Sequence, residues 1–392
     1  MDSAEPGLPV HPELAARLGA ATHRNARGAA PGSAGVRTAA AGYFHRRGLP
    51  TGPEQVVCAA GGGPLLLLVL SASPGDLVLP RPGRRRYPAQ ARLLGRRLVS
   101  VPTPAECGGV PDPFALLESV RRFRENGGDP RILVLTVPDD PTGTLPPPEL
   151  LHEVCEVARD LDLLVVSDET LRDLAHHPTA TAMAVSPAEI LPERTVVVTG
   201  PGASLALSGW RFGVARFPSG PIGDPLLRRV LDRAAVLEAV APAPVQDAVA
   251  WALSEPAVLD AHLAACVRLH AAVVAETRAL LRRAGALCRP AQAGYQLYPD
   301  LGPVADHLAR RSVSDSASLE RHLLDRFGVA VSGGHRFGDD PLALRFRVTT
   351  GALYGTSTEQ RWLALRAEDP LRLTHVSEAL TALGLLFTEL TN

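Results

Sequence analysis

The chain has 392 residues, 46% of them hydrophobic, and a formal net charge of -1 at pH 7. That length suggests two domains, the apolar content suffices for a sizeable core, and the near-neutral charge argues against nucleic acid or an acidic membrane as a partner. All 40 residues in the combined lysine and arginine count are arginine, so the chain contains no lysine. GC-rich codons account for part of this absence, because methionine and phenylalanine are scarce too.

From Gln55 to Phe217, short strand-like runs alternate with helix-like segments. The expected strands are Val56–Ala59, Leu77–Pro80, Leu98–Val101, Ile132–Thr136, Leu163–Ser167 and Thr195–Thr199. The expected helices, each with a proline at or near its start, are Pro64–Ser73, Pro88–Gly95, Pro113–Glu125 and Pro147–Leu161. Such alternation predicts a mostly parallel sheet that helices cover on both faces.

After Pro218 the pattern changes. Helices are expected first, at Pro225–Glu238, Pro244–Leu253 and Leu259–Gly285. Strands then follow at Tyr295–Tyr298, Val329–Val331 and Ala343–Thr349, with helices at Ser318–Arg326, Glu359–Leu365 and Leu371–Leu390. We therefore expect residues 1–45 to form an N-terminal arm and helix that join the small domain, 46–240 a large α/β domain, and 241–392 a connecting helix and a small α+β domain.

Five cysteines are spread along the chain without CxxC spacing, which argues against structural zinc and against a disulfide framework. The N-terminal residues lack the apolar stretch of a signal peptide, and the most apolar run, Leu65–Leu70, is too short to cross a membrane. We expect a cytoplasmic protein with no metal site and no membrane partner.

Four segments occur in an order and at spacings that resemble the class I/II aminotransferases, the fold-type-I pyridoxal phosphate enzymes. They are Gly35-Val36-Arg37 with Gly42-Tyr43-Phe44, then Asp140-Pro141-Thr142-Gly143, then Ser167 to Leu174 (SDETLRDL), and last Thr199 to Gly213 (TGPGASLALSGWRFG). The resemblance covers nearly the whole chain. It implies the fold-type-I fold, with a large domain around a mostly parallel sheet and a smaller α+β C-terminal domain. It also implies two subunits, either a homodimer or a heterodimer with an active paralogue.

At the positions that serve the cofactor, the chain departs from the family. The family's lysine, eight residues before the Trp-Arg arginine, corresponds to Ala203, whose methyl group cannot form an imine. Five further positions differ: Gly202 replaces a phosphate-binding serine, Asp140 an asparagine, Leu171 and Ala30 two tyrosines, and the arginine run beginning at Arg84 a stacking aromatic ring. We therefore expect that pyridoxal phosphate is not bound covalently and that no cofactor is used.

The residues that bind anions in the family are matched better in this chain than the other cofactor-binding positions. Arg211 matches the arginine that holds the cofactor phosphate, and Asp168 the aspartate that pairs with the pyridine nitrogen. The Gly61-Gly62-Gly63 turn resembles the phosphate cradle at a helix N-terminus, where free N–H groups favour an anion. Arg345 matches the arginine that binds a substrate carboxylate, a role that suits its planar fork.

These matches predict a cavity lined by Arg84, Asp140, Asp168, Arg211, Tyr295 and Arg345. We expect the four residues other than the aspartates to bind a small carboxylated metabolite. Asp168 or Asp140 is the candidate catalytic base of an isomerisation, cyclisation, elimination or condensation without cofactor, in specialised-metabolite biosynthesis.

Three alternatives stay open. In the first, the chain is an inactive subunit that pairs with an active paralogue. In the second, it binds pyridoxal or pyridoxamine phosphate without a covalent bond. In the third, the same residues have structural roles: Asp168 caps a turn, the Arg84 run is a solvated face, and the glycines form an ordinary turn.

Overall fold

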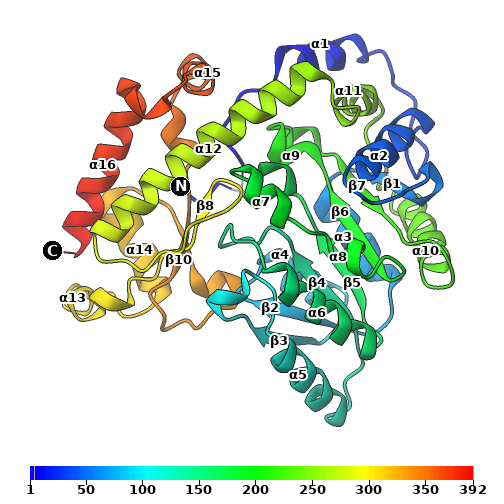
Figure 1. The fold of residues 1–392 in the computed structure, drawn as a ribbon, viewed down its shortest axis with the longest axis horizontal. Helices are drawn as coiled ribbons and strands as arrows, with labels where there is room; N and C mark the ends of the chain where they lie inside the picture. Colours follow the sequence, from blue (N-terminus) through cyan, green and yellow to red (C-terminus); the bar gives the residue numbers. More distant parts are fainter. Residues whose placement is uncertain (4, 392) are drawn as a thin grey trace.

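The computed structural model describes residues 1–3 and 5–391, and its centre is a seven-stranded sheet in the order β1-β7-β6-β5-β4-β2-β3 (Figure 1). The strands are β1 (Val56–Ala59), β2 (Asp76–Arg81), β3 (Leu98–Pro102), β4 (Pro130–Thr136), β5 (Leu164–Asp168), β6 (Thr195–Thr199) and β7 (Gly213–Arg216). β7 runs antiparallel to both of its neighbours, whereas the pairs between β6, β5, β4, β2 and β3 are parallel. The carboxyl ends of the parallel strands therefore meet at one edge, where open α/β sheets bind ligands.

Helices cover both faces of this sheet, which explains why β4 reads as a continuous apolar run. Ile132 and Val134 face one core cluster, and Leu133 and Leu135 face another. The first cluster includes residues of α3 (Gly62–Ala72), α4 (Arg86–Leu93) and α10 (Gly223–Val236). The second includes residues of α5 (Pro113–Glu125), α6 (Pro148–Asp160) and α7 (Pro178–Met183). Two short helices, α8 (Pro187–Ile190) and α9 (Pro201–Ser204), flank β6 in the chain.

Of the two N-terminal helices, the second packs against β1 and β7. The two helices are α1 (Pro12–Ala20) and α2 (Ala34–Arg46), and both contact α11 (Ala243–Leu253). The side chain of Ser33 caps α2 by accepting a hydrogen bond from Val36 N. The long helix α12 (Ala257–Arg283) then leads to the C-terminal part (Figure 1).

A separate core holds the C-terminal part together, and its largest fully buried side chains include Tyr354, Phe346 and Phe387. The three-stranded antiparallel sheet there has the order β8-β10-β9, with β8 (Gln296–Leu297), β9 (Ser332–Gly333) and β10 (Phe346–Thr349). Its helices are α13 (Ala305–Ala309), α14 (Ser316–Phe327), α15 (Thr358–Arg366) and α16 (Thr374–Thr391).

The predicted architecture of a mostly parallel sheet with a smaller α+β part is confirmed. Strand β7 and the helices α1, α7, α8, α9 and α13 were not predicted from the sequence, and β9 was predicted too early. Val331 is buried as its apolar character suggests, but the ladder with β10 begins at Ser332, because backbone pairing rather than side-chain burial defines the strand.

Candidate functional site

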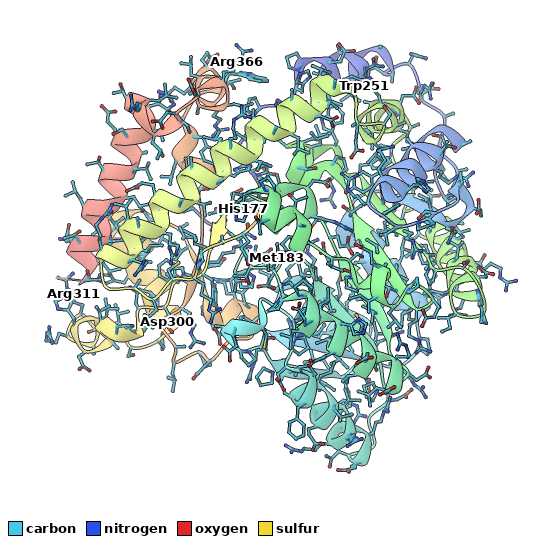
Figure 2. The ribbon with its side chains drawn as sticks, viewed as in Figure 1. His177, Met183, Trp251, Asp300, Arg311 and Arg366 are labelled. Carbon is cyan, nitrogen blue, oxygen red and sulfur yellow. The ribbon has the colours of Figure 1, made fainter. Side chains whose placement is uncertain are left out.

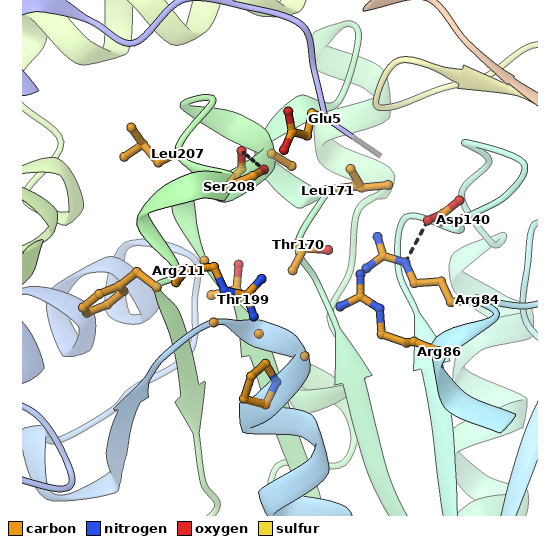
Figure 3. A pocket seen from close by; sticks show the side chains of 18 of the residues that line it. Glu5, Arg84, Arg86, Asp140, Thr170, Leu171, Thr199, Leu207, Ser208 and Arg211 are labelled. Atoms are coloured by element: carbon orange, nitrogen blue, oxygen red, sulfur yellow. Dashed lines mark hydrogen bonds and ion pairs between the residues drawn. The ribbon is translucent and has the colours of Figure 1, made fainter. Parts of the chain in front are cut away.

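A cavity of about 670 Å³ lies at the carboxyl edge of the central sheet (Figure 3). Its walls come from the start of α3, from the loops that follow β2, β4, β5 and β6, and from β10. The predicted residues that border it are Gly61, Gly62, Gly63, Arg84, Asp140, Ala203, Arg211 and Tyr295. The structure thus brings together most of the predicted site at the place where this type of sheet binds ligands.

Arg84 forms the centre of a buried ion-pair network in this cavity. Its Nη1 lies 2.8 Å from Asp168 Oδ2, and its Nε lies 3.0 Å from Asp140 Oδ2. The hydroxyl of Tyr87 also donates to Asp168 Oδ2, at 2.8 Å. Gly83 makes this placement possible, because a Cβ on Gly83 would lie 2.6 Å from the carbonyl oxygen of Pro80. Arg84, the first residue of the arginine run, is therefore buried and does not belong to a solvated face.

Both carboxylates of the network are held in their charged form. Burial opposes ionisation of Asp168, but Arg84 and Arg86 together keep its pKa below the ordinary value. For Asp140, burial is likewise outweighed by Arg84 and Arg347, and its pKa is lowered as well. A carboxylate with a lowered pKa is a weak base, so neither group is well placed to accept a proton near neutral pH.

Two of the predicted lining residues lie elsewhere. Asp168 is only 3% exposed and lies behind Arg84, with Thr170 donating to its second oxygen at 2.8 Å. Arg345 lies outside the cavity, so its expected position there was wrong. Its Nε lies 2.8 Å from Asp300 and its Nη1 3.2 Å from Asp339, and these two carboxylates draw it into a different cavity.

Arg347, two residues further along, occupies the cavity instead. Its Nη1 lies 3.1 Å from Asp140 Oδ1, and its Nη2 donates to the carbonyl oxygen of Asp2 at 3.2 Å. The Leu344-Arg345-Phe346-Arg347 segment offers two arginines, and a motif match alone does not distinguish them. The two arginines differ in the carboxylates that they pair with in the folded chain: Arg345 pairs with Asp300 and Asp339, and Arg347 pairs with Asp140.

Two other guanidinium groups flank the N-terminus of α3, as Figure 3 shows for Arg86 and Arg211. Nη2 of Arg211 would lie 3.7 Å from a Cβ on Gly61, and Nη1 of Arg86 3.6 Å from a Cβ on Gly63. Neither guanidinium has a hydrogen-bond or ion-pair partner among residues 1–3 and 5–391. Arg86 was not predicted as a site residue, and its only signal in the sequence was its position in the run that begins at Arg84.

The start of α3 depends on close packing with β7. A Cβ on Gly213 would lie 2.5 Å from the carbonyl carbon of Gly61 and equally close to the nitrogen of Gly62. Gly61 itself has a φ of 111°, a conformation that glycine adopts readily. These glycines bring the N-terminus of the 11-residue helix α3 to the border of the cavity. Free N–H groups and two unpaired guanidinium groups make this end of the cavity suitable for an anion.

Comparison with known proteins bears on this geometry. Residues 7–360 match the model of the family "Aminotransferase class I and II". The chain belongs to the class I and II aminotransferase family. Among curated family members, it is 34% identical over 216 residues to the aspartate/prephenate aminotransferase of Thermus thermophilus, a match that covers 54% of this chain and 53% of that one.

A longer match joins the chain to a bifunctional aspartate aminotransferase and glutamate/aspartate-prephenate aminotransferase of Petunia hybrida. It is 31% identical over 309 residues and covers 75% of this chain and 60% of the relative. The chain therefore spans only about half to three-fifths of the length of these curated relatives.

Solved structures of the family share the fold. The aspartate aminotransferase of Thermus thermophilus with maleate has a TM-score of 0.80 at 22% identity, covering 98% of this chain and 90% of that one. N-succinyldiaminopimelate aminotransferase from Mycobacterium tuberculosis has a TM-score of 0.80 at 24% identity, covering 98% and 92%. The predicted fold-type-I fold is confirmed.

Proposed function

We propose that this member of the aminotransferase family is a pseudo-aminotransferase: it binds a small anion in the cavity and does not transfer amino groups. The observation that carries the proposal is the buried network in which Arg84 pairs with both Asp140 and Asp168. This network fills with protein groups the part of the cavity next to Asp168, where the resemblance to the family puts the pyridine ring of the cofactor.

The absence of an amine supports the same proposal. Ala203 borders the cavity at the position where the family has its lysine, and no other residue of the chain is a lysine. Covalent catalysis with a carbonyl cofactor needs an amine nucleophile. A methyl group at this position cannot supply one, and arginine is not a substitute because its guanidinium stays protonated.

The residues present do not fit pyridoxal phosphate held without a covalent bond either. A pyridinium nitrogen would need the carboxylate of Asp168, but Oδ2 of Asp168 already accepts from Arg84 and Tyr87. Its other oxygen, Oδ1, accepts from Thr170. Binding the ring there would require Arg84 to leave Asp168, and breaking a buried ion pair costs several kcal/mol, roughly 3–5.

The anion end of the cavity supports a binding function. The start of α3, Arg86 and Arg211 together favour a phosphate or a carboxylate. The competing proposal, acid/base catalysis by Asp140 or Asp168, is weaker because arginines lower the pKa of both groups. Pairing with an active paralogue would give such a binding subunit its biological role, and it remains a prediction about partners.

Calorimetry with inorganic pyrophosphate and with pyridoxal phosphate tests the proposal. We expect saturable pyrophosphate binding that Arg211→Ala and Arg86→Ala each weaken about 10-fold or more, because a hydrogen bond to a charged group contributes about 1.5–3 kcal/mol. Arg85→Ala is the control, since Arg85 is exposed and does not border the cavity. Transfer of an amino group from aspartate to 2-oxoglutarate in the presence of pyridoxal phosphate would refute the proposal.

A further inference from the structure

A second cavity, of about 700 Å³, borders Asp139, whose neighbour Asp140 borders the first. One of its walls consists of loops after β2, β3 and β4 of the central sheet. The other wall consists of the end of α12 and of segments from the C-terminal part, among them Asp300, which Figure 2 labels. A cleft of this size between two separately packed cores lies within the range of small-molecule sites, roughly 300–1,000 Å³.

Three arginines give one wall of the second cavity a positive charge. Arg278 and Arg282 lie one turn apart on α12, and Arg289 follows in the next segment. Nε of Arg278 donates to the carbonyl oxygen of Cys288 at 2.9 Å, which leaves its two terminal nitrogens available. Within the part of the chain that the structure describes, the guanidinium of Arg282 has no partner, and the Arg289 guanidinium reaches only Glu106, at 3.9 Å.

The carboxylates of the second cavity do not neutralise these three arginines. Asp300 and Asp339 both pair with Arg345, and Asp339 also accepts from the hydroxyl of Tyr298 at 2.9 Å. Asp139 is 2% exposed, and burial raises its pKa to about 7, so a large fraction of this group is uncharged near neutral pH. Attraction for an anion therefore remains on the α12 side of the cavity.

The opposite wall offers an apolar surface. Pro82, Pro104 and Ala105 contribute apolar atoms there, and across the cavity Leu287, in the segment after α12, adds an aliphatic side chain that is 64% exposed. Thr103 borders the same cavity, and its hydroxyl is buried without a hydrogen-bond partner among the described residues.

We propose that this cleft is a second binding site, which takes a small organic anion with an apolar body. Arg278, Arg282 and Arg289 bind its carboxylate or phosphate group, while the proline and alanine wall covers its apolar part. A guanidinium matches either head group through paired hydrogen bonds. The proposal does not depend on the function of the first cavity, because it uses none of the residues that bind an anion there.

A pair of ligands of the same shape and different charge tests this proposal. 2-Naphthoate carries a carboxylate, 2-naphthamide is its neutral counterpart, and 2-naphthyl phosphate distinguishes a phosphate preference. By calorimetry in the presence of excess pyrophosphate, which is expected to occupy the first cavity, we expect one equivalent of an anion per chain, bound at least about 10-fold more tightly than the amide, a difference of 1.4 kcal/mol. The tighter of the two anions identifies the head group.

Variants locate the binding. Arg278→Ala combined with Arg282→Ala, and separately Arg289→Ala, are expected to weaken anion binding about 10-fold or more. Arg268→Ala is the matched control, because Arg268 is an exposed residue of α12 outside the cavity. Thermal unfolding checks that each variant is folded. The proposal is wrong if no anion binds saturably, if the amide binds equally well, or if Arg211→Ala rather than the α12 variants abolishes binding.

Discussion

The guanidinium of Arg84 contacts the carboxylate of Asp168 at 2.8 Å, although 84 residues separate the two along the chain. The pair joins the loop after β2 to the end of β5, and its side chains are only 8% and 4% exposed. Little solvent screens such a pair, so each partner depends on the other for its charge to be tolerated inside the protein.

Arg84→Ala is therefore expected to destabilise the protein by about 3–5 kcal/mol at pH 7, because it leaves the buried carboxylate of Asp168 without its ion-pair partner and Asp140 with Arg347 alone. Urea unfolding of the variant and of wild type measures the difference in free energy of unfolding. The exposed neighbour gives the control: Arg85→Ala is expected to stay within about 0.5 kcal/mol of wild type. Equal effects of the two substitutions would mean that the network contributes no stability.

The cost of Arg84→Ala is also expected to shrink in acid. Arg84 lowers the pKa of Asp140 and Asp168 in the folded state, so its stabilising effect is present above the ordinary carboxyl pKa of 3.8. It is lost as the pH falls through the lowered folded-state values, because protonated carboxyls no longer need a cation. A stability difference that stays constant from pH 7 to strong acid would contradict this.

Restoring a lysine at position 203 is not expected to restore efficient cofactor attachment. Ala203→Lys supplies an amine, but Arg84 still occupies the carboxylate that a pyridinium would need. The double variant Ala203→Lys with Arg84→Ala is expected to attach pyridoxal phosphate at least about 10-fold more tightly, which corresponds to 1.4 kcal/mol. Mass spectrometry after borohydride reduction measures the attachment.

The exposed position Ala89 gives the control for this experiment, since Ala89→Lys reports on unspecific reaction of an added amine. Attachment to the Ala203→Lys single variant that equals attachment to the double variant would show that Arg84 does not block the ring.

Gly213→Ala is expected to disturb the anion end of the first cavity. The new Cβ would lie 2.5 Å from the backbone of Gly61, so the start of α3 must shift, at a cost of about 1–3 kcal/mol. Gly209→Ala is the matched control, because no atom lies within 4 Å of its Cβ position. Pyrophosphate binding should weaken in the first variant only; unchanged binding in Gly213→Ala would show that the glycine contact does not position the helix.

Asp139 is expected to make stability depend on pH near neutrality. Burial raises its folded-state pKa from 3.8 to about 7, so the folded protein holds a proton that the unfolded chain releases. Its stabilising effect is complete below pH 3.8 and declines as the pH rises through about 7. The total amounts to about 4 kcal/mol, since one pKa unit corresponds to about 1.4 kcal/mol.

Asp139→Asn keeps the shape of the side chain and removes the titration. The difference in free energy of unfolding between this variant and wild type, followed from pH 4 to pH 8, isolates the contribution of Asp139. A difference that does not vary with pH would show that Asp139 does not titrate in this range.

The sequence predicted the elements that local patterns specify. The strands from β1 to β6 and the helices α5 and α6 fall within a few residues of their expected bounds, because apolar runs and helix-starting prolines are local signals. Gly213–Arg216 was missed as a strand because its four residues carry no such pattern of their own. This segment forms β7 because its backbone pairs with β1 on one side and with β6 on the other.

The sequence predicted which residues belong to the candidate site, but it did not predict which of them form ion pairs with one another. Motif spacing identified Arg84, Asp140 and Arg211 as residues of one cavity. It did not reveal that Arg84 pairs with both aspartates, because a contact across 84 residues depends on how the loops meet in space. The same limitation put Arg345 in the cavity instead of Arg347.

Helix α12 connects the surroundings of the two cavities. Its 27 residues span about 40 Å at 1.5 Å per residue. Near its first turn, Leu259 packs in one cluster with Leu207, which borders the first cavity, and near its last turn Arg278 and Arg282 border the second. One continuous helix therefore contributes side chains both to the packing beside the first cavity and to the wall of the second.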